Sequence, residues 1–465
     1  MNKKLLPHDN KTFGKTRRIH FIGIGGIGMS GIARIVHNLG FEVSGSDLKT
    51  SPVTGELKKQ GCRIYIGHRR ENIKNADVIV TSSAISPANE ELLHAREKGI
   101  TVIHRSEMLA ELMRLKFGIA VAGTHGKTTT TSIVASVCIE GGLKPTSVIG
   151  GNFLKINSNS TLGKGNLLIC EADESDGSFL NLSPTISIIT NIDNDHMDFY
   201  KTEENLRLHF LNFMNRTPFY GKNIICFEDQ TLRVLAEESS RPYVSYGFSP
   251  ACDLWADKIT FTEGKMNFQV HAEKPLGEFS IQVPGRHNVL NALAAIAAGL
   301  ELAIPPAKIK KGIASFNGVA RRMYTLGYVS GFRIMDDYGH HPTEIRATFE
   351  AVRLITRHLA AVFQPHRFTR TMNLYREFAD ALSSADTVFL TDIYPAGETP
   401  IKGISSALIY ELLKKKGVKT EYIRSRTALK NKLKIYCQQK EKGILLFLGA
   451  GDIYKTGREL VHDPA

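Results

Sequence analysis

The hexapeptide Gly-Thr-His-Gly-Lys-Thr at residues 123–128 has the residue types of a phosphate-binding loop. It follows an apolar run over 117–122 and leads into four consecutive threonines, Thr128–Thr131. In such a loop the backbone N–H groups hold phosphates, the lysine neutralises their charge and the threonine hydroxyl can ligate Mg²⁺. The first glycine stands two residues later than in the standard loop, because position 121 is valine. The threonine run disfavours the alternative, a glycine turn with a surface lysine, and we predict a Mg²⁺–nucleotide site around Lys127.

Two acidic segments could supply further oxygen ligands to this site. Glu171-Ala-Asp-Glu-Ser-Asp176 follows the apolar run 167–170, and Asn191-Ile-Asp-Asn-Asp-His-Met-Asp198 follows the run 186–190. Many acidic loops are solvated turns without a ligand. Both of these, however, directly follow predicted buried strands close to the phosphate loop, and Mg²⁺ prefers hard oxygen donors. We therefore expect them at the same sheet edge as Lys127.

A second glycine loop, Gly23-Ile-Gly-Gly-Ile-Gly28, lies between a predicted strand and a predicted helix. Asp47 follows at the end of the second strand, where a ribose-binding acid would lie. The glycines allow a pyrophosphate to approach the helix N-terminus, where unpaired N–H groups favour anions. Taken alone this pattern predicts NAD binding. A glycine turn that only allows close backbone packing is the alternative.

The last third of the chain holds Asp336-Asp-Tyr-Gly-His-His-Pro342 and Gln364-Pro-His-Arg-Phe-Thr-Arg-Thr371, each just past a predicted strand. Two arginines three residues apart can hold a carboxylate or a phosphate with bidentate forks. A lone histidine or arginine would more often be structural. Five such side chains at what we expect to be two adjacent strand ends indicate a binding pocket.

The elements that position these residues are strands that alternate with helices, which predicts parallel sheets with ligands at the carboxyl ends of the strands. The pattern begins at residue 18 and restarts twice, which predicts three α/β domains over 1–115, 116–317 and 318–465. We expect strands at 19–24, 42–45, 78–80, 117–122, 167–170, 186–190, 333–335, 360–363, 387–390 and 443–448, and helices at 29–39, 106–114 and up to 140.

Composition sets limits on the class of protein. The chain has 465 residues, of which 42% are hydrophobic and 23% charged, as in ordinary globular proteins. Its six cysteines include no Cys-x-x-Cys pair, which argues against a disulfide framework and a structural zinc site. Residues 1–18 are polar and basic, and no stretch approaches the ~18 apolar residues of a spanning helix. These features predict a soluble, cytosolic protein without membrane insertion.

The formal net charge of +13 is concentrated near the C-terminus, where residues 411–442 hold eleven Lys or Arg against three Asp or Glu. A solvated face is the expected role of this segment. Nucleic-acid binding is the alternative, but no reader motif accompanies the charge, and we expect no nucleic-acid partner. A basic excess also suits ligands that carry phosphates.

Taken together, the motifs resemble those of one family, the Mur ligases, over nearly the whole chain. They occur in order as GIGGIGMSGIA at 23–33, GTHGKTTTT at 123–131, EADESDGSFL at 171–180, NIDNDHMD at 191–198, GRHNVLNALAA at 285–295, DDYGHHPTEI at 336–345, QPHRFTRT at 364–371 and GAGD at 449–452. The ordered set is far more specific than any single motif. The resemblance implies a Rossmann-like N-terminal domain that holds a UDP-sugar, which replaces the NAD interpretation. It also implies a central P-loop ATPase-type α/β domain and a Rossmann-like C-terminal domain.

Within the family, the resemblance is to the enzymes that join L-alanine to the carboxylate of UDP-N-acetylmuramate through an acyl phosphate. It implies UDP-N-acetylmuramate, L-alanine and ATP as partners, Mg²⁺ as cofactor with Mn²⁺ as a substitute, and a monomer or weak homodimer. Neither chemical step needs a protein nucleophile, so catalysis would rest on positioning and charge neutralisation.

The resemblance further implies roles for individual residues. The implied ATP-binding residues are Gly123, Thr124, His125, Gly126, Lys127, Thr128, Thr129, Asn291 (adenine), Arg322 (phosphate) and Asp337 (ribose). The implied metal ligands are Thr128, Glu171 and His196. The implied UDP-sugar residues are Gly25, Gly26, Ser46, Asp47, His68, Ser82 and Ser83. Tyr338, His340, His366, Arg367 and Arg370 match the amino-acid pocket, and the implied catalytic residues are Lys127, His196, His340, Arg367 and Arg370.

One feature departs from the family pattern. Several relatives carry a carboxylated lysine in the helix after the DHxD motif, but residues 202–216 contain no lysine. Three other functions stay open at this point: a recycling ligase that takes a preformed peptide, an NAD-dependent dehydrogenase with an added NTPase domain, and a UDP-sugar sensor driven by ATP hydrolysis.

Overall fold

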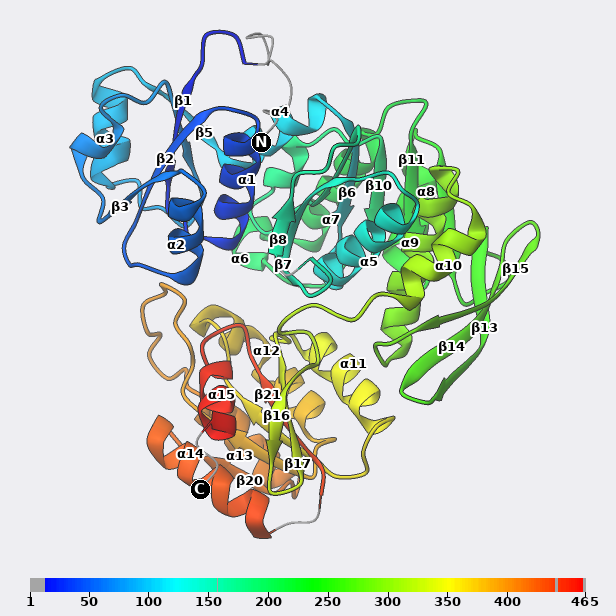
Figure 1. The fold of residues 1–465 in the computed structure, drawn as a ribbon. Coiled ribbons are helices and arrows are strands. Elements are labelled where there is room, and N and C mark those ends of the chain that lie inside the picture. The colour runs from blue at the N-terminus through cyan, green and yellow to red at the C-terminus, as the bar shows by residue number, and fades with distance from the viewer. Residues whose placement is uncertain (1–12, 157, 440–441, 463–465) are drawn as a thin grey trace. The chain divides into compact units, whose positions relative to one another are not determined.

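The computed structural model describes residues 13–156, 158–439 and 442–462, in which strands alternate with helices (Figure 1). The chain forms two compact units. The first holds the residues up to Gly247 with Ala251–Asp253 and Ala294–Gly312, and the second holds Phe248–Pro250, Leu254–Leu293 and the residues from Ile313 on. The predicted domain boundaries near 115 and 318 stay predictions.

The first sheet is parallel, five-stranded and ordered β3-β2-β1-β4-β5. The strand order reverses between β1 and β4, and ligands of open α/β sheets bind outside the carboxyl ends of strands at such a point. The strands are β1 (Arg18–Ile22), β2 (Glu42–Asp47), β3 (Arg63–Ile66), β4 (Val78–Thr81) and β5 (Thr101–His104). The helices are α1 (Ile27–Asn38), α2 (Pro52–Lys59), α3 (Glu90–Glu97), α4 (Arg105–Arg114) and the 3₁₀ turn η1 (Arg70–Ile73).

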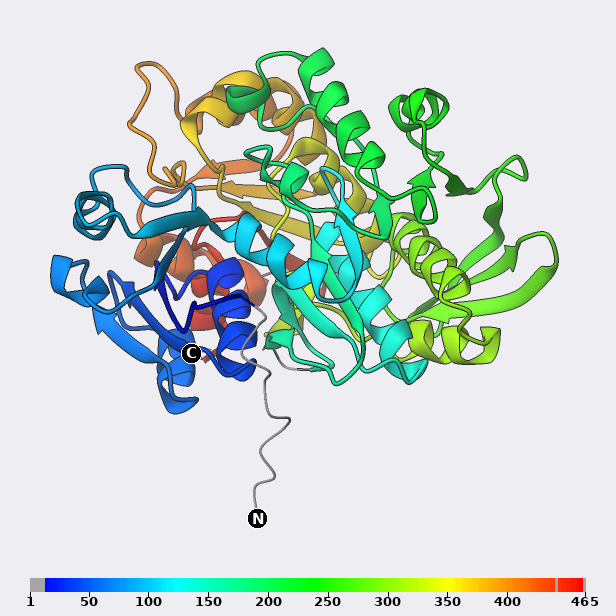
Figure 2. The same cartoon turned by 90° about the horizontal axis from the view of Figure 1, so that it is seen from above.

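The rest of the first unit is built on seven strands in the order β12-β11-β10-β6-β9-β7-β8. Figure 2 shows this part of the chain in cyan to green, with helices beside the strands. They are β6 (Phe117–Ala122), β7 (Thr146–Phe153), β8 (Ser158–Thr161), β9 (Leu167–Glu171), β10 (Ile186–Ile189), β11 (Lys222–Cys226) and β12 (Tyr243–Gly247). The accompanying helices are α5 (Lys127–Glu140), η2 (Ser178–Asn181), α6 (Met197–Tyr200), α7 (Glu203–Asn215) and α8 (Gln230–Glu238). β9 and β10 pair with β6 on its two sides, which confirms that both acidic segments follow strands next to the phosphate loop.

Two helices, α9 (Arg286–Glu301) and α10 (Pro306–Ala314), contribute to both units. The second unit begins with the antiparallel strands β13 (Leu254–Thr262), β14 (Lys265–His271) and β15 (Pro275–Ile281). The sequence analysis did not predict these three strands.

The second unit also holds a six-stranded sheet in the order β16-β17-β21-β18-β19-β20. Its strands are β16 (Tyr324–Val329), β17 (Phe332–Asp337), β18 (Leu359–Phe363), β19 (Thr387–Leu390), β20 (Thr420–Tyr422) and β21 (Ile444–Leu448). Its helices are α11 (Pro342–Arg353), α12 (Phe368–Leu382), α13 (Ala407–Lys415), α14 (Arg426–Gln439) and α15 (Tyr454–His462).

Strand β18 shows why the strands of this sheet are continuous apolar runs in the sequence. Leu359, Ala361 and Phe363 pack into a core with α11, α12 and α13, whereas Ala360 and Val362 pack into a separate core with α14 and α15. A strand covered by helices on both faces buries every side chain, so it lacks the alternation of a half-exposed strand.

Several expectations on composition can be compared with the structure. All six cysteines are free and buried, in agreement with the predicted lack of a disulfide framework. Among the described residues, none of the helices has the length and apolar character needed to cross a membrane. Residues 1–12 and 440–441 lie outside the described residues. The first range makes up most of the polar stretch 1–18, from which no secretion signal was expected, and the second belongs to the basic segment 411–442.

Candidate active site

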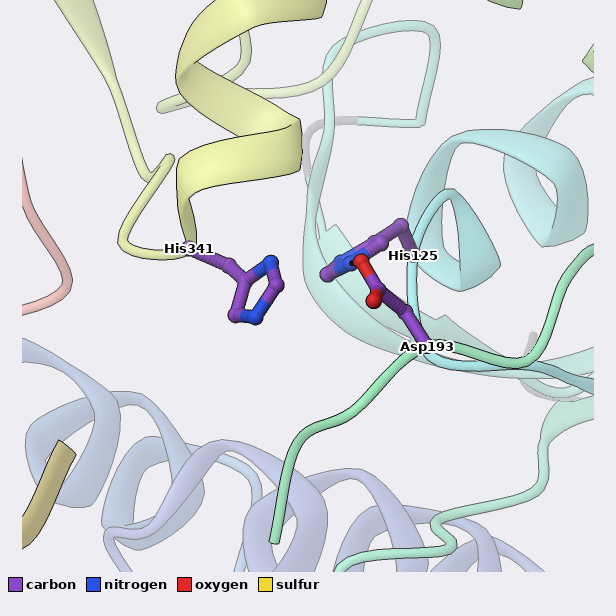
Figure 3. Close-up of side chains that lie close together, drawn as sticks. All are labelled: His125, Asp193 and His341. Carbon is purple, nitrogen blue, oxygen red and sulfur yellow. Dashed lines mark hydrogen bonds and ion pairs between the residues drawn. The ribbon is translucent and has the colours of Figure 1, made fainter. Parts of the chain in front are cut away.

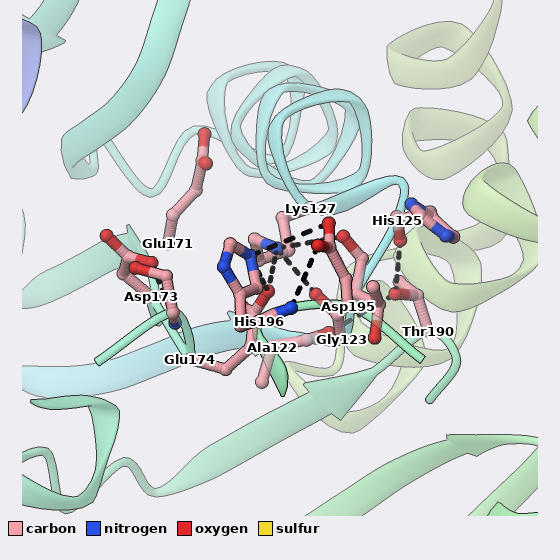
Figure 4. Close-up of polar contacts among 12 residues, drawn as sticks. Ala122, Gly123, His125, Lys127, Glu171, Asp173, Glu174, Thr190, Asp195 and His196 are labelled. Carbon is pink, nitrogen blue, oxygen red and sulfur yellow. Dashed lines mark hydrogen bonds and ion pairs between the residues drawn. The ribbon is translucent and has the colours of Figure 1, made fainter. Parts of the chain in front are cut away.

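Lys127, the first residue of α5, is held in place by the loop that precedes it (Figure 4). Its Nζ donates to the carbonyl oxygens of Gly123 at 2.6 Å and Thr124 at 3.1 Å, and to Glu174 Oε1 at 2.8 Å. Burial alone would lower the pKa of Lys127, but the attraction of Glu174 and the neighbouring carboxylates raises it above its ordinary value. The ammonium group is therefore charged and fixed at the N-terminus of a helix, as phosphate binding requires.

The loop backbone is fixed by residues at the end of β10. Asn191 receives the His125 backbone N–H on its Oδ1 at 2.8 Å, and its Nδ2 donates to the His125 carbonyl at 3.0 Å. Thr190 Oγ1 donates to the same carbonyl at 2.6 Å. Gly123 has a φ of +123°, and a Cβ on it would lie 2.1 Å from Thr190 Oγ1. Part of the NIDND segment therefore shapes the phosphate loop.

His125 and Asp193 form a second contact between the phosphate loop and the segment after β10 (Figure 3). His125 Nε2 lies 2.9 Å from Asp193 Oδ2, and both side chains are partly buried. Asp193 also donates its backbone N–H to Thr124 Oγ1 at 2.9 Å. This contact fixes the His125 ring within the phosphate loop, whose backbone N–H groups would face the phosphates.

The oxygen donors expected for Mg²⁺ come together at the start of α5. Thr128 Oγ1 donates to Glu171 Oε2 at 3.0 Å, and Glu171 Oε1 accepts the backbone N–H of Gly150. A hydroxyl and a carboxylate at this spacing, beside a charged lysine, form a donor set that fits Mg²⁺. A Cβ at Gly150 would lie 2.6 Å from Glu171 Oε2, so a larger residue there would shift the Glu171 carboxylate.

His196, the third predicted metal ligand, occupies the left-handed backbone region at φ +58°, just before α6. Its Nε2 lies 3.8 Å from Glu174 Oε1 and 3.8 Å from Asp195 Oδ2. It thus lies near Glu174, the carboxylate that holds Lys127 (Figure 4). Thr128 and Glu171, in contrast, are hydrogen-bonded to each other.

Glu174 is a site residue that the sequence analysis did not select. It is 1% exposed, and burial raises the pKa of its carboxyl to about 7 against the attraction of Lys127. The hydroxyl of Tyr200 donates to the Glu174 carbonyl oxygen. The sequence signal was present in EADES, but nothing in that segment distinguished Glu174 from its acidic neighbours.

Asp173 joins this region to the N-terminal sheet. Arg105 Nη2, from the first residue of α4, donates to Asp173 Oδ2. Burial would raise the pKa of Asp173, but Arg105 and Lys127 lower it to about 2. A Cβ on Gly28, in the first glycine loop, would lie 3.5 Å from Arg105 Nη1. Arg105 therefore lies between the first glycine loop and the acidic segment 171–176.

The predicted UDP-sugar residues follow the carboxyl ends of β1 to β4. Gly25 donates its backbone N–H to Asp47 Oδ2 at 2.9 Å, so the acid that ends β2 holds the glycine loop. Ser82 and Ser83 follow β4, and the Ser82 carbonyl accepts the N–H of Ile85 at 3.0 Å. Gly26 is exposed and forms the N-cap of α1 without a side-chain hydrogen bond. Ser46 and His68, 2.9 Å apart, complete the set.

In the second unit, the predicted amino-acid residues form a chain of ring contacts. The Tyr338 and His340 rings are 5.3 Å apart, the His340 and His366 rings 5.8 Å, and His366 stacks on Tyr394 at 5.6 Å. Arg370 Nη1 lies 3.3 Å from His366 Nδ1. Tyr394 did not appear in the sequence analysis.

Arg367 and Arg370 lie at the N-terminus of α12, and Glu398 holds that terminus. Glu398 Oε2 accepts the backbone N–H groups of Phe368 at 2.6 Å and Thr369 at 3.1 Å. Arg367 has a φ of +70°. The two arginines are thus presented at a helix end whose own N–H groups already have a carboxylate partner.

The phosphate and ribose candidates of the second unit make firm internal contacts. Arg322 Nη1 lies 3.2 Å from Glu344 Oε1. Asp337 accepts the N–H groups of Met323 and Gly339, each at 2.7 Å, and burial raises the pKa of its carboxyl. Asn291 lies on α9, where its Nδ2 donates to Asn288 Oδ1 at 3.2 Å.

One expectation about this sheet is wrong. The strand ends that carry DDYGHHP and QPHRFTRT are not adjacent, because β21 lies between β17 and β18 and pairs with both. The two strand ends are therefore one strand apart, although the side chains of His340 and His366 still bring the two motifs into contact. Gln364 Oε1 accepts the N–H groups of Asp452 and Ile453 at 3.0 and 3.1 Å and joins the GAGD loop after β21 to the β18 end.

Three family models match the chain in order. Their descriptions are "Mur ligase family, catalytic domain" over residues 18–117, "Mur ligase middle domain" over 121–299 and "Mur ligase, glutamate ligase domain" over 321–451. The chain belongs to the Mur ligase family. The predicted α/β fold with three domains is confirmed for this Mur ligase by the same three matches.

This Mur ligase is similar to named relatives over nearly its whole length. It is 49% identical to a UDP-N-acetylmuramate–L-alanine ligase of Geobacter sulfurreducens, with 96% of this chain and 97% of the relative covered. The protein of the same name from Brachyspira hyodysenteriae is 46% identical, with 96% and 97% covered. The crystal structure of a UDP-N-acetylmuramate–alanine ligase from Thermotoga maritima matches with a TM-score of 0.80 at 29% identity, over 96% of this chain and 98% of that one.

Proposed function

We propose that this Mur ligase joins L-alanine to the carboxylate of UDP-N-acetylmuramate with hydrolysis of ATP to ADP and phosphate, a step in the synthesis of peptidoglycan precursors. The observation that carries the proposal is the near-complete coverage, at 46–49% identity, by relatives named UDP-N-acetylmuramate–L-alanine ligase. The charged Lys127 at the start of α5 supports the ATP-dependent chemistry.

The reaction must overcome the low reactivity of a carboxylate toward an amine. Transfer of the γ-phosphoryl group of ATP to a muramoyl carboxylate oxygen gives an acyl phosphate and ADP. The L-alanine amine then attacks the acyl carbon, loses a proton and displaces inorganic phosphate. Because no protein nucleophile is needed, the chain contributes by positioning the reactants and neutralising charge.

In this scheme the first unit holds the triphosphate and the sugar. Lys127 and the N-terminus of α5 bind phosphate oxygens, and the carboxylate of Glu174 keeps the ammonium group in place before ATP arrives. Thr128 and Glu171 are the residues we assign to Mg²⁺, with His196 as a further ligand; when bound, the ion neutralises phosphate charge. The edge formed by Gly25, Gly26, Ser46, Asp47, His68, Ser82 and Ser83 holds the UDP-sugar.

In the second unit, Tyr338, His340, His366, Arg367 and Arg370 hold the amino acid and the reacting phosphate. Arginine forks suit both the carboxylate of an amino acid and a phosphate. Asn291, Arg322 and Asp337 are assigned to the adenine, a phosphate and the ribose. Acyl phosphates hydrolyse in water. The proposal therefore includes a closure of the protein that shields the bound substrates from solvent.

A coupled phosphate-release assay tests this function. With UDP-N-acetylmuramate, ATP and Mg²⁺ present, L-alanine should stimulate phosphate release, and mass spectrometry should detect the amide product. Release only with a preformed tripeptide would identify a recycling ligase instead, and phosphate release without an amide would identify a sensor. A thermal shift with NADH but none with the UDP-sugar would favour the dehydrogenase.

A further inference from the structure

Glu91 carries a carboxylate that is fully buried in the N-terminal sheet and makes contacts through both of its oxygens. Its Oε2 accepts the Ser46 hydroxyl at 2.6 Å. Its Oε1 accepts Asn72 Nδ2 at 2.6 Å and the Arg69 backbone N–H at 3.3 Å. A buried charge is rare unless it is paired or richly hydrogen-bonded, and this network supplies such hydrogen bonds to Glu91.

The position of Glu91 links three strand ends. Ser46 is the second-last residue of β2, Asn72 and His68 follow β3, and Glu91 lies in the first turn of α3, which follows β4. These are carboxyl ends of parallel strands in one sheet, the edge at which open α/β sheets bind ligands. Glu91 thus acts on the edge where the UDP-sugar residues are proposed, although it lies beneath the surface.

The carboxyl group is ionised. Burial would raise the pKa of Glu91, but the hydrogen bonds from Ser46 and Asn72 and the nearby His20, whose Nε2 lies 3.6 Å from Glu91 Oε2, lower it below its ordinary value. The position in the first turn of α3, where Asn89 Oδ1 caps the Glu91 N–H at 2.9 Å, also favours an anion. An ionised carboxylate can only accept hydrogen bonds, so the Ser46 hydroxyl must use its single O–H to donate to Glu91.

This requirement fixes the protonation of His68. The Ser46 oxygen, having donated to Glu91, can only accept from His68 Nδ1, which lies 2.9 Å away. His68 Nδ1 is also 3.4 Å from Glu91 Oε2, a second acceptor. Nδ1 must therefore carry a proton, and in a neutral ring Nε2 is left as a hydrogen-bond acceptor.

We propose that Glu91 is a positioning residue of the UDP-sugar site, which acts through Ser46 to hold His68 as the Nδ1–H tautomer, so that Nε2 accepts a hydrogen bond from a hydroxyl or N–H donor of the ligand. The inference rests on the proposed function, because it takes His68 as a UDP-sugar residue. It adds a buried residue to that site and states the kind of ligand group that His68 recognises.

The variant Glu91→Gln tests the inference, because a glutamine keeps the shape but presents both a donor and an acceptor. We expect it to weaken UDP-N-acetylmuramate about tenfold by calorimetry, the scale of a lost hydrogen bond to a charged group, with unchanged affinity for an ATP analogue. At saturating UDP-sugar, kcat should stay unchanged while the KM for the UDP-sugar rises. Titration of UDP alone shows where the donor lies: an equal loss places it on the nucleotide, and no loss places it on the sugar.

Glu97→Gln is the matched control, since it removes the same charge from the same helix at a side chain that is 51% exposed. It should bind both ligands like the wild type. A double-mutant cycle of Glu91→Gln with His68→Gln adds a second test, because residues that act through one another are not additive. The double variant should bind the UDP-sugar no more weakly than His68→Gln alone.

The tautomer can be read directly in the wild-type protein labelled with ¹⁵N-histidine, with the His68 signal assigned by its loss in His68→Gln. We expect the pattern of an Nδ1-protonated ring. An Nε2-protonated ring in the wild type would overturn the inference, as would additive losses in the cycle or an equal loss of ATP-analogue affinity in Glu91→Gln. Because binding is measured without turnover, these outcomes are distinct from failure of the ligation assay.

Discussion

Lys127 combines a flexible side chain with an unusually fixed position. Two main-chain carbonyls and the buried Glu174 hold its Nζ, and all three contacts lie within the phosphate loop or the segment after β9. Lys127→Ala should lower kcat about 10³-fold, since it removes a charge aimed at the phosphates. Calorimetry with UDP-N-acetylmuramate should give the wild-type affinity, because the UDP-sugar residues lie on a different sheet.

Lys311→Ala is a suitable control for this prediction. Lys311 pairs with Glu140 at 3.0 Å and its side chain is 73% exposed, so the variant removes an equal charge from the surface of the same unit. It should leave kcat unchanged. Loss of UDP-sugar binding together with turnover in Lys127→Ala would contradict the separation of the two sites.

Gly123 allows a test of the loop backbone. Gly123→Ala should weaken binding of an ATP analogue strongly, because the added Cβ would lie 2.1 Å from Thr190 Oγ1 and the backbone φ is +123°. Gly142→Ala is the matched control, as its φ is +82° and a Cβ there would meet nothing within 4 Å. It should cost about 1–2 kcal/mol of stability, from the left-handed backbone alone, and leave ATP binding intact. Equal effects of the two variants on ATP binding would show that the loop tolerates a side chain.

At the scale of the element, Asp77 fixes the start of β1 next to β4. Its carboxylate accepts the N–H groups of Arg17 and Arg18, each at 2.8 Å, and Arg18 Nη2 at 2.7 Å. The hydrogen bond from the Arg18 side chain and those from the two backbone groups lower the pKa of Asp77 to about 2. A carboxyl whose pKa is lower in the folded state stabilises above its unfolded pKa of about 3.9 and loses this contribution as the pH falls toward 2.

Asp77→Asn should therefore be less stable than the wild type at pH 7, and the difference should shrink between about pH 4 and pH 2. Urea unfolding followed across this range by circular dichroism measures it. Asp380→Asn, at a side chain that is 59% exposed in the second unit, controls for loss of one negative charge. A difference for Asp77→Asn that stays constant down to pH 2 would contradict the lowered pKa.

The strands that carry the site motifs were predictable, because strands buried on both faces appear in the sequence as short apolar runs that end at glycines or polar motifs. β6 begins and ends at the predicted residues, and β2 runs two residues further than predicted. Besides the hairpin strands β13 to β15, the prediction missed β3, β5, β7, β8, β11, β12, β16 and β20, because it relied on apolar runs that end at a chemical motif. The position of β21 between β17 and β18 was also missed, because apolar runs do not state the order of strands in a sheet.

Site residues that belong to a chemical motif could be predicted from the sequence. Residues that differ from their neighbours only in being buried could not. Lys127, Thr128 and Glu171 were named from loop and acidic motifs, and Thr128 does contact Glu171. Glu91 was not named, and Glu174 was named only as one member of the acidic segment 171–176, because in the sequence they are acidic residues among others, at a helix start and in a turn. Only their burial, at 0% and 1% exposed, distinguishes them, and burial depends on contacts between distant parts of the chain.

At the scale of the molecule, the N-terminal sheet and the central strands of the first unit are joined by specific hydrogen bonds. Arg34, on α1, donates from Nη1 to Ser158 Oγ at 2.8 Å and to Ser160 Oγ at 3.1 Å, both on β8. Asn159, between them, donates to the Ile27 carbonyl at 2.7 Å. Because α1 follows the first glycine loop, these contacts link the proposed UDP-sugar edge to the sheet that carries the phosphate loop.

Arg34→Ala should loosen this link without unfolding either sheet. The guanidinium is only 11% exposed, and its removal leaves the β8 hydroxyls without a charged donor, at a cost of about 1–3 kcal/mol. Hydrogen exchange followed by mass spectrometry should show faster exchange in α1 and β8 together, while β6 and β21 stay as protected as in the wild type. Arg63→Ala, an exposed change on β3, should leave all four elements unchanged. Faster exchange throughout the N-terminal sheet would instead mean that Arg34 stabilises that sheet alone, and that other contacts, such as Arg105 with Asp173, carry the link.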